Sequence, residues 1–126
     1  MSVGSAGGGS IQFVAPKTVL GSVEYSYNAA GTVELGSRPN LGLGDSMNEP
    51  VRENAIKMPS DMIAFGDGNS LVLSPVTSND YPAGRHNAKA NVAFCDGHVE
   101  AKRPAQWTGK NEAVRSRWNN DHLPHF

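Results

Sequence analysis

The sequence predicts a mainly β fold of the α+β type: a small antiparallel sheet with hairpins, long loops and at most one or two short helices. Two observations predict it. Hydrophobic residues make up 38% of the 126 positions, and 14 glycines with 8 prolines fill about a sixth of them, which favours short strands between turns. In addition, an Asp-Gly dipeptide stands between two strand-like segments in the second half of the chain.

The first third of the chain is expected to be extended over residues 11–35. Val23–Tyr27 alternates aromatic or branched residues with polar ones, which is the period of a half-buried strand. A turn at Asn28–Gly31 leads to another short β candidate at Thr32–Leu35. Residues 36–50 are then predicted to be a loop, because glycines and prolines interrupt them throughout.

The middle of the chain contains a helical turn and a strand. Val51–Ile56 is predicted to form a short helical turn, since its first five residues include no helix breaker. Met62–Phe65 is the clearest strand of the first half, and Gly66-Asp67-Gly68 ends it. Leu71–Leu73 is expected to be the return strand of this pair.

A β-hairpin is the strongest local prediction. Ala90–Cys95 and His98–Lys102 are strand-like and are separated only by Asp96-Gly97. This dipeptide supplies the positive φ angles that a two-residue hairpin turn requires. Beyond Pro104, Asn111–Trp118 is expected to form a short helix capped by Asn111, and residues 119–126 a polar tail.

One internal similarity affects the choice of site. Ile63–Gly68 resembles Val92–Gly97 almost position for position. If the two strands lie beside each other, Asp67 and Asp96 are expected at the same rim of the sheet. The alternative is a chance similarity between two buried strands.

Chain organisation points to one small domain. Residues 1–10 have the composition of a flexible linker or a cloning remnant, and residues 11–126 are assigned to a single β-rich domain. No stretch reaches about 18 apolar residues, and no signal peptide is recognised. The formal net charge is −1 without a basic stripe, so nucleic acid is not an expected partner. The single cysteine, Cys95, has apolar neighbours and is expected to be buried and inert.

Histidine and aspartate residues around the hairpin form the candidate metal site. His86 precedes the hairpin, Asp96 and His98 flank its turn, and Asp67 ends the earlier strand. Imidazole with carboxylate suits zinc, whereas carboxylates with carbonyl oxygens suit calcium. The other interpretation is structural: Asp96 forms the turn, His98 faces solvent, and His86 bonds a loop carbonyl.

Catalytic signatures are missing from the chain. The histidines do not follow the His-Glu-x-x-His spacing, and no serine lies in Gly-x-Ser-x-Gly. Cys95 has apolar neighbours rather than a base. No residue is therefore assigned a catalytic role, and the chain is not expected to be an enzyme.

A longer pattern surrounds the hairpin. His86 is followed by nine residues and then by Asp96-Gly97, with Arg85 before it and His98-Val99-Glu100 after it. Further blocks are Tyr25-Ser26-Tyr27-Asn28, Leu41-Gly42-Leu43-Gly44, Pro59-Ser60-Asp61-Met62-Ile63-Ala64 and Arg117-Trp118-Asn119-Asn120-Asp121-His122. In kind and order these blocks resemble the H-X9-DG domain of prepilin-type proteins, which are common in planctomycetes and verrucomicrobia.

The resemblance implies a type II secretion pseudopilin-like protein, of which this chain is the β-rich head without the N-terminal stalk helix. Such a head is extracytoplasmic and is anchored in the membrane only through that helix. Its partners are other pilin or pseudopilin subunits or secretion-system components. The residues His86, Asp96, Gly97 and His98 then form a structural motif. Related major pseudopilins bind calcium in a C-terminal loop, which the aspartates here do not visibly reproduce.

Two functions from different classes follow. The first is a structural or assembly subunit that acts through protein–protein contacts. The second is a metal-binding (Ca or Zn) or metal-dependent hydrolytic domain that uses His86, Asp96 and His98, with Asp67 as a further ligand. Loss of thermal stability in a chelator would favour the second, because a metal that binds only the folded state stabilises it.

Overall fold

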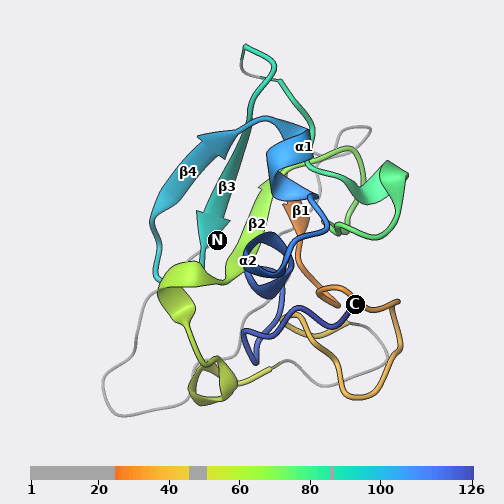
Figure 1. The fold of residues 1–126 in the computed structure, drawn as a ribbon, viewed down its shortest axis with the longest axis vertical. Helices are drawn as coiled ribbons and strands as arrows, with labels where there is room; N and C mark the ends of the chain where they lie inside the picture. The colour runs from red at the N-terminus through yellow and green to blue at the C-terminus, as the bar shows by residue number, and fades with distance from the viewer. Residues whose placement is uncertain (1–24, 46–50, 86) are drawn as a thin grey trace.

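The computed structural model describes residues 25–45, 51–85 and 87–126, and four short strands run through its centre (Figure 1). The strands are β1 (Tyr25–Tyr27), β2 (Ile63–Asp67), β3 (Ala90–Phe94) and β4 (Val99–Lys102). They form one sheet in the order β1-β2-β3-β4, and every neighbouring pair is antiparallel. Only two short α-helices accompany the sheet in these ranges, which confirms the expected mainly β, α+β fold class.

The strand β3 is covered on one face by an apolar cluster. Ala90, Val92 and Phe94 alternate along the strand, so their side chains share that face, and all three are fully buried. Two tryptophans from the C-terminal part of the chain, Trp107 and Trp118, complete the same cluster. Local alternation in β3 therefore provides the surface on which the helical segment packs.

The strand β2 confirms the prediction made for Met62–Phe65, although it begins one residue later and continues to Asp67. A β-bulge between Ile63 and Phe65 shifts its register against β3. Its side chains contribute to two separate clusters. A second cluster lies among Tyr27, Ala29, Leu43, Ile56, Met62, Ala64 and Cys95. The centre of the sheet is thus buried by different parts of the chain.

The predicted hairpin is present as β3 and β4, but its loop is one residue longer than expected. The Phe94 N–H donates to the His98 oxygen at 2.9 Å, and the Gly97 N–H donates to the Phe94 oxygen at 2.9 Å. Three residues, Cys95 to Gly97, therefore lie between the paired positions. Gly97 has φ +95°, whereas Asp96 is not among the described residues with positive φ. A three-residue loop needs only its glycine in that conformation.

Two predicted strands are wrong. Thr32–Leu35 lies in turns, because the chain reverses at Gly31 (φ +66°) and the Thr32 N–H donates to the Asn119 side chain instead of a neighbouring strand. Leu71–Leu73 does not return along β2, whose outer edge is already paired with β1. Val72 instead forms an isolated parallel bridge with Tyr27.

Short helical elements begin at residues that favour helix starts. The helical turn predicted within Val51–Ile56 is present as η1 (Glu53–Ala55). The helix α2 (Glu112–Ser116) is capped by Asn111, whose side-chain oxygen accepts the Val114 N–H at 2.9 Å.

Further helical elements were not predicted. The helix α1 (Pro104–Trp107) starts at a proline, which needs no N–H partner in the first turn. The 3-10 turns η2 (Pro59–Asp61) and η3 (Ser78–Asp80) connect loops. In Figure 1, α1 and α2 lie over one face of the sheet, in agreement with the contacts of Trp107 and Trp118.

Several predictions concern positions outside the described residues: the linker at 1–10, the extended segment up to residue 24, and His86. Among the residues that are described, no helix has the length and apolar character needed to cross a membrane.

Candidate functional site

Asp67 and Asp96 lie at opposite ends of the central strands. Since β2 and β3 are antiparallel, the end of β2 meets the start of β3, and the Asn91 N–H donates to Asp67 Oδ2 at 2.9 Å. Asp96 follows the end of β3 and lies beside η2, where its N–H donates to the Pro59 oxygen at 3.2 Å. The expectation of a shared rim is therefore wrong, and Asp67 does not join Asp96 and His98.

The hairpin turn places His98 between two carboxylates. Its Nδ1 is 2.5 Å from Asp96 Oδ1, and its Nε2 is 2.9 Å from Glu100 Oε2. The imidazole is stacked on Phe94, with ring centroids 4.4 Å apart and planes 5° from parallel. His98 is thus held at both ring nitrogens and by one ring face, rather than pointing freely into solvent.

These contacts shift the pKa values of all three groups. The hydrogen bond to Glu100, followed by that to Asp96, raises the pKa of His98 above its ordinary value. The backbone N–H of His98 and then its ring lower the pKa of Asp96. Burial acts to raise the pKa of Glu100, but hydrogen bonds from His98 and Arg117 outweigh it and lower that pKa to about 2. The arrangement favours a protonated imidazole between two carboxylates.

Arg117 extends this arrangement across to η2. Its Nε donates to Asp61 Oδ1 at 2.8 Å, and a terminal nitrogen donates to both Glu100 oxygens at 2.9 Å. The guanidinium also lies over the Phe94 ring, 4.6 Å from its centroid. On the far side, His122 Nε2 is 2.7 Å from Asp61 Oδ2.

We refer to the resulting chain of alternating groups as the charge network. Its members are Asp96, His98, Glu100, Arg117, Asp61 and His122. Sequence reasoning missed Glu100, Arg117, Asp61 and His122 as members. For Glu100 a signal existed, since residues two apart on a strand share a face. For Arg117 and Asp61 no local signal existed, because they are 56 positions apart.

The charge network differs from a metal centre in its geometry. Within residues 25–45, 51–85 and 87–126, no three histidine, cysteine or acidic side chains converge in a way that would hold a metal ion. Both ring nitrogens of His98 face carboxylates, so zinc ligation would require the ring to give up one of these contacts. The position of His86 lies outside the described residues, and the metal hypothesis remains a prediction.

Three asparagines hold the long loop of residues 28–45 against the rest of the fold, and we call them the asparagine clamp: Asn28, Asn119 and Asn120. Asn28 is completely buried. Its amide donates to the Ile63 oxygen at 2.7 Å and to the Trp118 oxygen at 2.9 Å. A single amide thereby joins the start of the loop, the strand β2 and the C-terminal segment.

The other two clamp residues come from the start of the segment that was predicted to be a polar tail, and the structure has no helix or strand in residues 119–126. Asn119 is buried, accepts the Thr32 N–H at 2.9 Å and donates to the Leu123 oxygen at 2.7 Å. Asn120 donates to the Asn40 oxygen at 2.8 Å and to the Gly42 oxygen at 3.0 Å. The polar side chains of Asn119 and Asn120 therefore serve hydrogen bonding inside the molecule.

The two tryptophans are linked by hydrogen bonds. Trp118 Nε1 donates to the Trp107 oxygen at 2.8 Å, and Trp107 Nε1 donates to the Ala90 oxygen at 3.1 Å. Both rings are fully buried, as is Tyr27, whereas Tyr25 is half exposed. These aromatic side chains therefore mainly build the core.

Cys95 is buried among apolar side chains, as expected from its neighbours. Burial, aided by the charge of Asp96, raises the pKa of its thiol to about 12. Thiolate chemistry in the folded state is thereby suppressed.

Comparison with known proteins adds no relative: no protein-family model, no curated protein and no solved structure matches this chain. What the fold and the site define is a small antiparallel-sheet domain with a charge network at its hairpin and an asparagine clamp on its long loop.

Proposed function

We propose that this chain is the extracytoplasmic head of a prepilin-like or type II secretion pseudopilin-like protein, a structural and assembly subunit that acts through protein–protein contacts. Its partners would be other pilin-like or pseudopilin-like subunits or secretion-system components. In the full-length protein, a membrane-anchoring helix would precede the head. The chain is assigned no catalytic residue.

The observation that carries this proposal is that residues of the family-like blocks have structural roles. Asn28, Asn119 and Asn120, which belong to the family-like blocks, are hydrogen-bonded into the scaffold, and Gly97 forms the hairpin turn. Blocks whose residues anchor a loop are suited to a rigid head domain, whose surface is then available for assembly. The resemblance to prepilin-type proteins suggests that the assembly is with pilin-like or pseudopilin-like subunits or secretion-system components.

The surface offers apolar side chains for such contacts. On β4, Val99 is 61% exposed, and this strand pairs only with β3 in the described sheet. An edge strand with an exposed apolar side chain is a common place for association between chains. Lys102 and Glu100 on the same strand limit unspecific pairing, since charges on an edge strand oppose it.

The test uses cells that produce the full-length protein. Its gene is expected to encode an apolar helix of about 20 residues ahead of Ile11, enough to cross a bilayer. Formaldehyde treatment of these cells should give a ladder of multimers on an immunoblot, and deletion of the apolar segment should abolish the ladder. A gene without such a segment, together with a protein that stays monomeric after cross-linking, would refute the proposal.

A further inference from the structure

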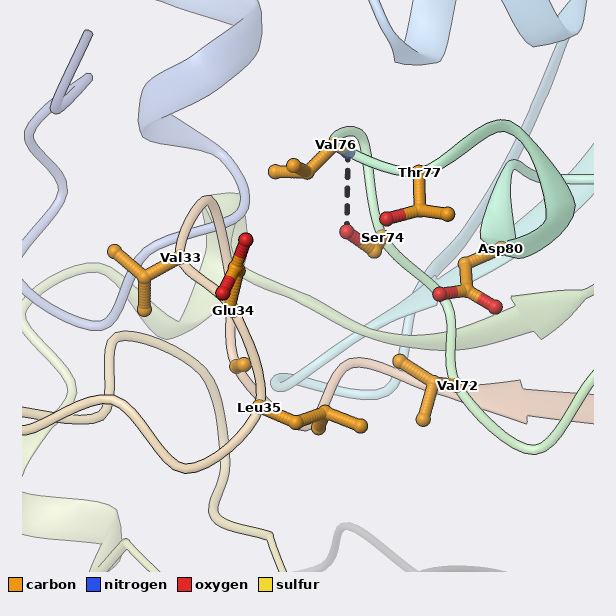
Figure 2. A pocket seen from close by; sticks show the side chains of 9 residues that line it. Val33, Glu34, Leu35, Val72, Ser74, Val76, Thr77 and Asp80 are labelled. Atoms are coloured by element: carbon orange, nitrogen blue, oxygen red, sulfur yellow. Dashed lines mark hydrogen bonds between the residues drawn. The ribbon is translucent and has the colours of Figure 1, made fainter.

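A surface cavity of about 310 Å³ lies away from the charge network, between the loop of residues 30–35 and the segment of residues 72–80. Figure 2 shows its lining side chains, which come from both segments. The lining residues are Ala30, Val33, Glu34, Leu35, Val72, Ser74, Val76, Thr77 and Asp80. None of them belongs to the family-like blocks discussed above.

Aliphatic and polar side chains share the walls of this cavity. Val33, Leu35, Val72 and Val76 contribute branched side chains, and both Leu35 and Val76 are more than 40% exposed. Exposed aliphatic side chains around a hollow favour an apolar ligand portion, because covering them removes apolar surface from water. The segment that carries Val72 is anchored to the fold. Its neighbour Leu73 is fully buried, and the Leu73 N–H donates to the Tyr27 oxygen at 2.8 Å.

Two carboxylates accompany these walls. Figure 2 shows Glu34 and Asp80 on different sides of the cavity, each from a different segment. Asp80 Oδ1 accepts the Ser70 hydroxyl at 2.7 Å, which orients the group and leaves Oδ2 for another donor. Among the described residues, neither carboxylate forms an ion pair with a basic side chain. The negative charge of the cavity is thus not compensated within the part of the chain that the structure describes.

We propose that this cavity receives the side chain of a lysine presented by a protein partner. Its four-carbon chain would lie against the valines and Leu35, and its ammonium group would reach Glu34 and Asp80, with the Thr77 hydroxyl as a further acceptor. Lysine side chains commonly place their methylene groups on apolar surface and their charge at its edge. The inference does not depend on the pseudopilin-like assignment.

The chemistry of the cavity selects lysine over two other cations. A guanidinium is planar and prefers two parallel hydrogen bonds to one carboxylate, whereas an ammonium has three donors that can reach acceptors on different sides. Calcium prefers a shell of six to eight oxygen ligands, and the four branched aliphatic side chains of the lining contribute none to such a shell. An alkylammonium group matches both the walls and the carboxylates.

The experiment is a titration of the isotopically labelled chain with Nα-acetyl-lysine N-methylamide, followed by amide chemical shifts. Saturable shifts are expected at residues 33–35 and 72–80. The norleucine analogue lacks the ammonium and should bind at least about threefold more weakly, the scale of an exposed ion pair. Glu34→Gln should weaken lysine binding by a similar factor, and so should Asp80→Asn, which keeps an oxygen for the Ser70 hydroxyl.

The matched control is Glu112→Gln, which removes the same charge from an exposed position on α2, outside the cavity lining. It should leave binding unchanged. The proposal is overturned if no saturable shifts appear at the cavity, or if Glu112→Gln weakens binding as much as Glu34→Gln. Equal binding of the norleucine analogue, tighter binding of the arginine analogue or of free cadaverine, or shifts at the same amides with CaCl2 instead of lysine would also overturn it.

Discussion

The β3–β4 hairpin and the loop of residues 28–45 keep their shapes by different means. In the hairpin, backbone groups within about twelve positions of each other pair, from Ala90 with Lys102 to Ala93 with Val99. In the loop, regular pairing is replaced by side-chain amides, and the Asn28 amide reaches a carbonyl 90 positions away. The hairpin is therefore fixed by local interactions, and the loop by interactions that exist only once both ends of the chain have met.

This difference predicts how each region responds to mutation. A buried amide that holds two carbonyls leaves both without a partner when it is removed, whereas a turn residue changes only its own backbone energy. We therefore expect substitutions at the clamp and its tryptophans to cost more stability than substitutions in the hairpin turn. The predictions below run from the largest expected effect to the smallest.

Trp118→Ala should be the most damaging change, lowering the free energy of unfolding by about 3–5 kcal/mol. The ring is completely buried and its Nε1 donates to the Trp107 oxygen, so the variant loses packing and leaves a carbonyl unpaired. Urea denaturation followed by far-UV circular dichroism measures the loss. A loss smaller than that caused by a turn substitution would invalidate the contrast between the two regions.

Asn28→Ala should lower the free energy of unfolding by about 2–4 kcal/mol, because the buried Ile63 and Trp118 carbonyls lose their donor. Asn54→Ala serves as the matched control. Asn54 is exposed, and its substitution should stay within about 0.5 kcal/mol of the parent. Equal urea midpoints for the two variants would show that the amide does not hold the loop.

Gly97→Val should destabilise by about 1–3 kcal/mol, as a branched residue resists the conformation at φ +95°. A Cβ at this position meets nothing within 4 Å, so the cost comes from the backbone alone. Gly97→Asn should therefore recover much of the loss, since asparagine tolerates positive φ better. Parent-like thermal melting of Gly97→Val would mean that the turn has a different shape.

His98→Gln should destabilise more at acidic than at basic pH. The pKa of folded His98 is raised, so its contribution is fully present below its ordinary value of 6.5 and is lost as the pH rises through the folded value. Melting temperatures of parent and variant should accordingly differ more at about pH 5.5 than at about pH 8.5. At the lower of these pH values Glu100, with its pKa near 2, stays ionised. A difference independent of pH would contradict an ionic role for His98.

An excess of EDTA should leave the melting temperature unchanged if the charge network is structural. The metal hypothesis predicts the reverse: stoichiometric calcium or zinc after purification and a marked drop in melting temperature on chelation. His86→Ala provides the control, because it should abolish any chelator effect that depends on the proposed ligand set. A chelator-sensitive parent would revive the metal-binding function.

Those features that depend on neighbours in sequence were predictable. Each of three confirmed features depends on residues that lie close together in the sequence: the alternation in β3, the glycine at the hairpin turn and the Asn111 cap. Even there, Asp-Gly left the loop length open, because two-residue and three-residue loops both accept a glycine with positive φ. Local patterns therefore give the element but not always its geometry.

The remaining features depend on partners far along the chain. Leu71–Leu73 has the composition of a strand, but whether it pairs with β2 depends on whether β1 already occupies that edge. Likewise, the sequence around Asn119 is typical of a solvated tail, and only the contact with Thr32, 87 positions away, shows that its side chain is part of the fold. The charge network also joins residues from three segments, and no periodic pattern marks such a meeting.

The burial of Cys95 has a practical consequence. Because the chain has one cysteine and the fold covers it, a thiol reagent can modify the native protein only during moments when the sheet opens. The rate of thiol modification therefore measures how often the region between β2 and the hairpin opens, and no label has to be introduced. The unmodified chain thus contains a built-in probe of its own local opening.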